Sequence, residues 1–117
     1  MHKNCTLYKT MDLLGKKWTL PILLELYKKN CLRYNQLKSC MNNITPKILS
    51  LRLKELEKEK LVSKKIDSTI VPIRCEYSLT ESSKDFINII QDIKKWGLKW
   101  KFSNKTCEHT SCKNCKL

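Results

Sequence analysis

Glycine and histidine are scarce in this chain of 117 residues, and each scarcity argues against a class of chemistry. The two glycines, Gly15 and Gly97, cannot form a glycine-rich loop that cradles a phosphate. His2 lies near one terminus and His109 near the other, so neither is a candidate general base in a folded core. No Ser/His/Asp set and no pair of carboxylates suited to a cleft is visible. The sequence therefore predicts a protein that is not an enzyme.

Long apolar runs are missing as well. The longest run, residues 20–24, is far too short to cross a bilayer and lies within a helical pattern. No signal peptide is recognisable, so we expect a cytoplasmic protein with no membrane partner. In that reducing compartment the seven cysteines are expected to be free, metal-bound or redox-active, rather than joined in a structural disulfide framework.

Acidic residues are outnumbered, because 11 Asp and Glu stand against 24 Lys and Arg, giving a formal net charge of +13. A field of this size attracts polyanions such as nucleic acid, an anionic membrane surface or an acidic protein. Nucleic acid is favoured, since no basic helix here carries the bulky apolar face of a membrane-surface anchor. The length indicates one domain with a single modest core.

Helical periodicity covers most of the chain. Apolar residues recur at helical spacing in four segments, residues 5–14, 17–29, 45–61 and 81–102. Asn35 can cap a further brief helix, in which Leu37 and Met41 face inward. This brief helix, a turn at Asn42 and Asn43, and the next helix together predict a helix-turn-helix.

The segment 45–61 is the helix that we expect to carry function. Thr45 can accept a hydrogen bond from a free amide at the helix start, and Pro46 suits the first helical position. Three leucines form an apolar stripe that faces a core, at positions Leu49, Leu53 and Leu56. A second face is cationic and polar, with Lys47, Ser50 and Lys54.

After Leu61 the pattern changes from helical to alternating. Val62 and Ile66 share one side of a first strand. The second strand alternates apolar and polar residues, with Ile73, Cys75, Tyr77 and Leu79 on the half-buried side. Residues 67–72 connect the two strands as a hairpin loop between basic flanks. The fold predicted is mainly α with a small β-hairpin, an α+β winged helix-turn-helix in which the hairpin is the wing.

The last helix carries a longer apolar stripe than a small core can cover. Its members are Phe86, Ile89, Ile90, Ile93, Trp96, Gly97 and Trp100. A band of this kind marks an association surface, and helix-turn-helix readers commonly bind DNA as dimers, which favours a homodimer. The alternative is that the helix folds back wholly onto its own domain.

Four ordered segments resemble the HxlR-type winged helix-turn-helix transcriptional regulators, which are related to the MarR group. The segments are residues 12–19, 45–50, 52–57 and 72–80, and the likeness extends from about Cys5 to Trp100. The resemblance implies a homodimeric repressor or activator whose recognition helix begins at Thr45 and enters the major groove of double-stranded DNA. It also implies a dimer interface made by the first and last helices, where Leu7 and Met11 join the stripe, and a thiol sensor at Cys5.

Ten residues are expected to contact DNA: Thr45, Pro46, Lys47, Ser50, Leu51, Arg52, Lys54, Lys64, Lys65 and Arg74. The lysines and Arg74 suit phosphates, whereas Thr45, Lys47, Ser50 and Leu51 lie where a recognition helix reads bases. Arg52 could instead form an internal ion pair with a neighbouring acid. Two positions depart from the family pattern, namely Leu51, where a polar residue is expected, and the apolar hairpin loop at Ile70 and Val71.

The cysteines leave several readings open. Residues 1–104 are predicted to form the winged helix domain with its dimerisation helices, and residues 105–117 a tail rich in cysteine and lysine. The tail residues Cys107, His109, Cys112 and Cys115 could hold zinc or part of an iron–sulfur cluster. They could instead exchange disulfides with Cys5 of a partner chain, or remain unpaired thiols. Cys31, Cys40 and Cys75 are expected to be small core residues.

The function predicted is a sequence-specific DNA-binding transcriptional regulator that acts as a homodimer and responds to cysteine oxidation. One alternative is a metal-responsive or iron–sulfur-responsive regulator that uses the tail cysteines. Another is a winged helix that serves only as a protein-interaction module, since fold alone does not decide function. The salt dependence of DNA affinity distinguishes these cases: both kinds of regulator should bind DNA less tightly as the salt concentration rises, whereas a protein-interaction module should show little dependence.

Overall fold

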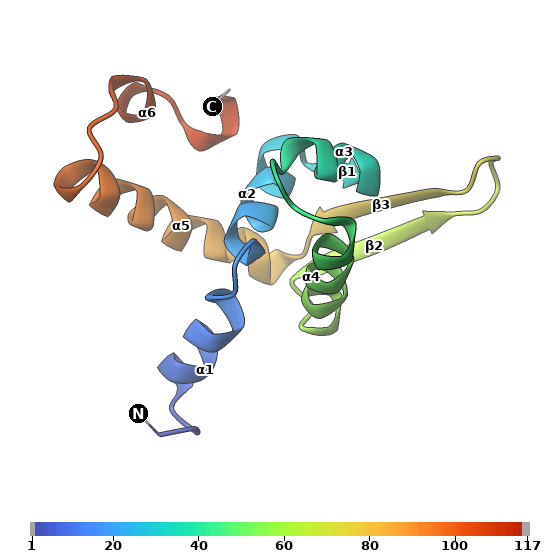
Figure 1. The fold of residues 1–117 in the computed structure, drawn as a ribbon, viewed down its shortest axis with the longest axis horizontal. Helices are drawn as coiled ribbons and strands as arrows, with labels where there is room; N and C mark the ends of the chain where they lie inside the picture. Colours follow the sequence, from blue (N-terminus) through green and yellow to red (C-terminus); the bar gives the residue numbers. More distant parts are fainter. Residues whose placement is uncertain (1, 116–117) are drawn as a thin grey trace.

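The computed structural model describes residues 2–115 and is mostly helical, with one small antiparallel sheet (Figure 1). The elements in chain order are α1 (Thr6–Leu14), α2 (Thr19–Lys29), β1 (Cys31–Arg33), α3 (Tyr34–Cys40), α4 (Pro46–Lys58), β2 (Val62–Asp67), β3 (Arg74–Leu79), α5 (Glu81–Trp100), α6 (Lys105–His109) and a 3-10 turn, η1 (Cys112–Asn114). A helix-turn-helix followed by a hairpin confirms the predicted winged helix architecture. None of the described helices has the length and apolar character needed to cross a membrane.

The sheet has three strands in the order β1-β3-β2, all antiparallel. The predicted hairpin is β2–β3, in register from Val62 opposite Leu79 to Asp67 opposite Arg74. The third strand, β1, pairs with β3 through Cys31 opposite Ser78. The sequence predicts this segment only as extended, because three residues are too few to show the alternation that identifies a paired strand.

The core lies where α2, α3, α4 and the first half of α5 meet one end of the sheet. Its fully buried side chains include Ile22, Leu23, Leu26, Leu37, Leu49, Leu53 and Leu56. The three leucines predicted to line the inner face of α4 are all among them. Val62, Tyr77 and Leu79 extend this core onto the base of the hairpin.

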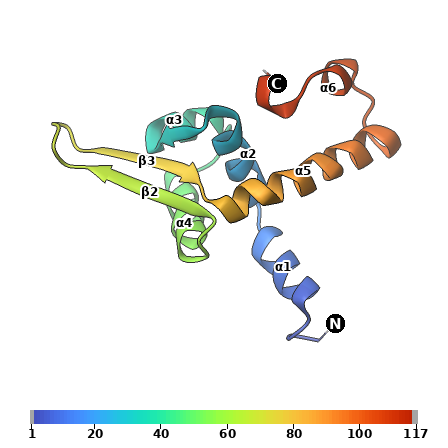
Figure 2. The same ribbon diagram turned by 180° about the vertical axis from the view of Figure 1, so that it is seen from behind.

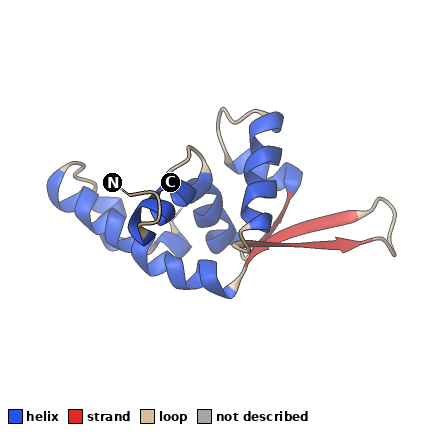
Figure 3. Ribbon diagram, turned by 90° about the horizontal axis from the view of Figure 1, so that it is seen from below, coloured by secondary structure: helices blue, strands red, loops and turns tan. Residues whose placement is uncertain are grey.

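Beyond that base the hairpin leaves the body of the molecule (Figure 3). The prediction that the second strand is half-buried is therefore wrong at Ile73, which is exposed, and Ile66 on the first strand is exposed as well. Alternation identifies which residues share a face of a strand, but burial also requires another element to cover that face. No described helix covers this part of the hairpin.

One helix cap differs from expectation. Asn35 lies within α3, whose N-terminal cap is Arg33, and the Gln36 side chain accepts a hydrogen bond from the Arg33 amide at 2.9 Å. Thr80 is the N-terminal cap residue of α5, and its hydroxyl donates to the Lys60 carbonyl at 2.7 Å. This hydrogen bond connects the start of α5 to the segment between α4 and β2.

The two halves of helix α5 lie in different surroundings (Figure 2). In its first half, Ile87 and Ile90 are buried in the domain's own core and Phe86 packs at the core's edge. Phe86 and Ile90 were predicted to belong to a dimer interface, and the structure uses them within the chain instead. In the second half the helix runs beyond the core, so that Ile93 and Trp96 are exposed. Helix α1 also projects from the body, with Leu7 and Met11 among its exposed residues.

The described part of the tail, residues 105–115, folds back toward α2 (Figure 1). Lys113 holds it there, because its ammonium donates to the Tyr27 carbonyl and to Asn30 Oδ1 and lies 4.8 Å from the centre of the Tyr27 ring. Lys94 of α5 donates to the Thr110 carbonyl at 2.9 Å. These lysine contacts join the tail to both helices. Residues 116–117 of the predicted tail lie outside the described part of the chain.

Candidate DNA-binding surface

Helix α4 begins as the sequence predicts. The Thr45 backbone is extended, and its side-chain oxygen accepts a hydrogen bond from the Ile48 amide at 3.2 Å. Pro46 occupies the first helical position. A backbone N–H at this position has no acceptor within the helix, so the N–H that proline lacks is not missed. Thr45, Pro46 and Lys47 are all exposed. The start of α4 therefore presents its positive dipole end and a lysine to the surroundings.

The two faces of α4 have opposite characters. The inner face is sealed into the core by its leucines, whereas Lys47, Leu51 and Lys54 are exposed on the outer side. Leu51 is 45 % exposed, which is unusual for a leucine on an amphipathic helix and leaves an apolar contact among cationic neighbours. This face combines charge for phosphates with an apolar group that suits a thymine methyl.

Tyr34 fixes the position of this helix, and sequence reasoning missed it. Its hydroxyl donates to the Pro46 carbonyl at 3.0 Å and accepts from the Ser50 hydroxyl at 3.3 Å. Ser50, predicted to read bases, is half-buried and already has this internal partner. A tyrosine at the first position of a short helix gives no signal in the sequence that its hydroxyl reaches a residue twelve positions further along the chain.

The sequence leaves two roles open for Arg52, a contact with DNA or an internal ion pair, and in the structure Arg52 has internal partners. Its Nε donates to the Lys17 carbonyl at 2.9 Å, its Nη1 lies 3.4 Å from Glu55, and the side chain is only 16 % exposed. Lys16 also approaches Glu55, at 3.5 Å. Arg52 thus ties α4 to the segment before α2, and its assignment to the DNA-contacting set is corrected.

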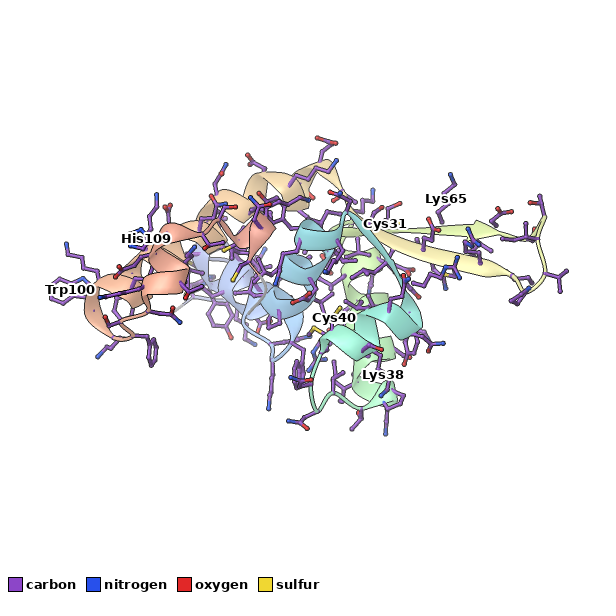
Figure 4. All side chains as sticks on the ribbon, turned by 90° about the horizontal axis from the view of Figure 1, so that it is seen from above. Cys31, Lys38, Cys40, Lys65, Trp100 and His109 are labelled. Atoms are coloured by element: carbon purple, nitrogen blue, oxygen red, sulfur yellow. The ribbon has the colours of Figure 1, made fainter. Side chains whose placement is uncertain are left out.

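The hairpin carries cations on both of its faces. Lys65 and Arg74 share one face, because their cross-strand partners Glu76 and Asp67 belong to the same alternation. Lys64 points to the opposite face, where its ammonium lies 5.9 Å from the Tyr77 ring. All three basic side chains are exposed, and Figure 4 shows Lys65 projecting away from the ribbon.

Two titratable groups reflect how the hairpin is built. Hydrogen bonds from the Thr69 hydroxyl and amide lower the pKa of the Asp67 carboxyl, so the turn into the loop is stabilised by an ionised aspartate. Burial raises the pKa of Tyr77 to about 12, with a further contribution from Cys75. Tyr77 therefore stays neutral at the hairpin base, where it belongs to the core.

Comparison with known proteins identifies the family of this chain. A family model described as HxlR-like helix-turn-helix matches residues 13–105. The chain belongs to the HxlR family. It is 37 % identical over 89 residues to the HTH-type transcriptional regulator YdzF of Bacillus subtilis, an alignment that covers 76 % of this chain and 81 % of that protein. The protein is thus a transcriptional regulator of the HxlR type.

Solved structures give the same result for the fold. One described as a MarR-family transcriptional regulator from Porphyromonas gingivalis W83 superposes with a TM-score of 0.75 at 34 % identity, covering 86 % of this chain and 96 % of that one. The redox regulator HypR in its oxidised form superposes with a TM-score of 0.72 at 32 % identity, covering 84 % and 99 %.

Cys5 forms the N-terminal cap of α1 and is half-buried. Cys31 and Cys40 are exposed, which corrects their assignment to the core, while Cys75 packs against the core's edge. Partial desolvation and a hydrogen bond from Cys31 Sγ to Glu76 Oε2 raise the pKa of the Cys31 thiol, which disfavours its reactive thiolate form.

The tail cysteines are half-buried and lie in or beside two separate short helical segments. Cys107 and His109 belong to α6, whereas Cys112 opens η1 and Cys115 follows it. Cys107, His109 and Cys112 line part of a groove of about 360 Å³ against α5, and Figure 4 shows His109 at this end of the molecule. Within residues 2–115, no group of three or more Cys, His, Asp or Glu side chains is arranged to hold a metal ion. The predicted ligand set is not brought together in this arrangement.

Proposed function

We propose that this HxlR-family regulator binds operator DNA as a homodimer, with the outer face of α4 in the major groove and the hairpin beside it. The observation that carries the proposal is the exposed set Thr45, Lys47, Leu51 and Lys54 on a helix whose other side is sealed into the core. The hairpin adds Lys64, Lys65 and Arg74 for flanking phosphates. A regulator of this kind works at the chromosome, so we place it in the cytoplasm of a bacterial cell.

The dimer interface of this proposal consists of the exposed apolar residues of α1 and the second half of α5. These are Leu7, Met11, Ile89, Ile93, Trp96 and Trp100. The four residues of α5 fall on one helical face, which is distinct from the face that buries Ile87 and Ile90. A dimer joined through these faces would present two α4 helices to two half-sites, which helix-turn-helix dimers bind about 34 Å apart.

The DNA assignment is tested by replacing Lys47. Lys47→Ala should reduce the slope of log affinity against log salt concentration by about 0.9, because one phosphate contact is lost. The measurement is a gel-shift titration at several salt concentrations, on a duplex selected from a random pool by the unaltered protein. Lys29→Ala removes an exposed lysine of α2, outside both α4 and the hairpin, and should leave the slope unchanged. Equal effects of the two substitutions would contradict the assignment of α4.

Control by oxidation centres on Cys5, at the start of the proposed interface helix. Peroxide would oxidise the Cys5 thiolate to a sulfenic acid and be reduced to water, and a second thiol could then condense with it to a disulfide, releasing water. The likeness to the redox regulator HypR supports this reading. A bond at the interface would change the spacing of the two recognition helices and so the operator affinity.

Mild peroxide should therefore alter operator affinity of the unaltered protein by about 5- to 150-fold, the usual range of coupling between two sites. Cys5→Ser should abolish this response, while Cys40→Ser, which removes an exposed thiol on α3, should retain it. Gel shifts paired with non-reducing electrophoresis provide the measurement. A full response in the Cys5→Ser protein would show that another thiol is the sensor.

A further inference from the structure

The tip of the hairpin is apolar and uncovered. Residues 70–73, here called the apolar tip, are Ile70, Val71, Pro72 and Ile73. Val71 is 97 % exposed and Ile73 is 66 % exposed. Figures 1 and 3 show that the tip lies at the end of the hairpin that is farthest from the core. Exposed apolar groups gathered in one place indicate a surface that becomes covered on binding.

The apolar tip has a defined base. The β2–β3 ladder continues to the pair of Asp67 and Arg74, and Asp67 holds the start of the loop through Thr69. Between the tip and the start of α3 lies a groove of about 640 Å³, bordered by Arg33 and Arg74. The tip is thus presented at the end of a paired hairpin and is flanked by basic side chains.

The surrounding charge identifies the partner that covers the tip. Arg33, Lys65 and Arg74 lie at its base together with two carboxylates, Asp67, which is engaged by Thr69, and Glu76, which lies opposite Arg33 and Lys65 in the sheet, so positive charge remains in excess. An apolar group framed by cations suits DNA, in which stacked bases lie between two rows of phosphates. Small apolar side chains cannot hydrogen-bond to base edges, but they can wedge between base pairs from the minor groove.

We propose that the apolar tip enters the minor groove next to each half-site and partly unstacks one base step, so that the operator is bent in the complex. This rests on the proposed DNA binding by α4 and adds a second, shape-based source of specificity. Pyrimidine–purine steps unstack most easily, so such a step is favoured beneath the tip although no base there is read by hydrogen bonds. Val71 and Ile73 are the residues that determine this preference.

The test uses the full-length protein on the selected operator duplex, labelled at its ends for energy transfer and with 2-aminopurine placed in turn at the flanking steps. The unaltered protein should bend the duplex by between about 20° and 90° and raise the 2-aminopurine fluorescence at one flanking step. The double variant Val71→Ser/Ile73→Ser should lose at least half of the bend and all of the fluorescence rise. Val71→Ile should retain both, because it preserves an apolar wedge.

Ile66→Ser is the matched control, since Ile66 is an exposed apolar residue on the same hairpin but outside the tip. It should bend DNA as the unaltered protein does. Specific binding without a bend or a fluorescence change would overturn the wedge and leave the binding by α4 intact. Absence of any duplex binding would instead overturn the proposed function itself. Binding to phosphatidylglycerol vesicles that the double variant loses, with the bend unchanged, would assign the tip to a lipid surface and reject the wedge.

Discussion

Trp96→Glu is expected to convert the dimer into monomers and to lower operator affinity by at least about 100-fold, because linkage of two half-site readers contributes 10²- to 10⁴-fold. Trp96 is 58 % exposed on the part of α5 that extends beyond the core, so the change leaves the domain's own packing intact. In a closed interface the new carboxylate would be buried without a partner, which is strongly unfavourable. Sedimentation velocity and gel-shift titration measure the two effects.

Asn88→Glu introduces the same charge at an exposed polar position of the same helix, away from the face that carries Trp96. It should leave the protein dimeric and its operator affinity close to that of the parent. A Trp96→Glu protein that sediments as a dimer and binds DNA normally would refute the interface proposed on α5.

Leu53→Ala should lower the free energy of unfolding by about 2–5 kcal/mol, the range measured for leucine truncations in well-packed cores. Leu53 is 1 % exposed in the middle of α4, where it packs with Leu49 and Leu56. Removing its side chain leaves a cavity beneath the outer face of α4, which is the face proposed to bind DNA. A loss of this size is a large fraction of the stability of a small domain. Urea unfolding at matched protein concentration gives the value, since association also contributes to stability.

Leu51→Ala supplies the comparison, two residues away on the same helix. Because Leu51 is exposed, its truncation should change the free energy of unfolding by no more than about 0.5 kcal/mol. If the two truncations cost the same, the assignment of inner and outer faces to α4 would be incorrect. This pair therefore tests the orientation of the recognition helix without any DNA present.

Local chemistry explains why the sequence could predict the recognition helix. The Thr45–Pro46 start, the leucine stripe and the change to alternation after Leu61 are each determined by residues within one or two turns of each other. The same local signals gave the order of helices and hairpin, and with it the resemblance to the HxlR family. The helix predicted over residues 5–14 is present as α1, with Cys5 as its N-terminal cap instead of its first helical residue.

The tertiary structure alone decided which of these side chains are available for function. Arg52 is engaged by Lys17, 35 residues away, and Ser50 is engaged by Tyr34. Lys113 is held by Tyr27, 86 residues away. Ile66 and Ile73 follow the alternation of buried strands yet lie in the open, because nothing covers that stretch of the hairpin. Periodicity depends on neighbours in the chain and so can be read from the sequence, whereas burial and hydrogen-bond partners depend on where distant segments return in space.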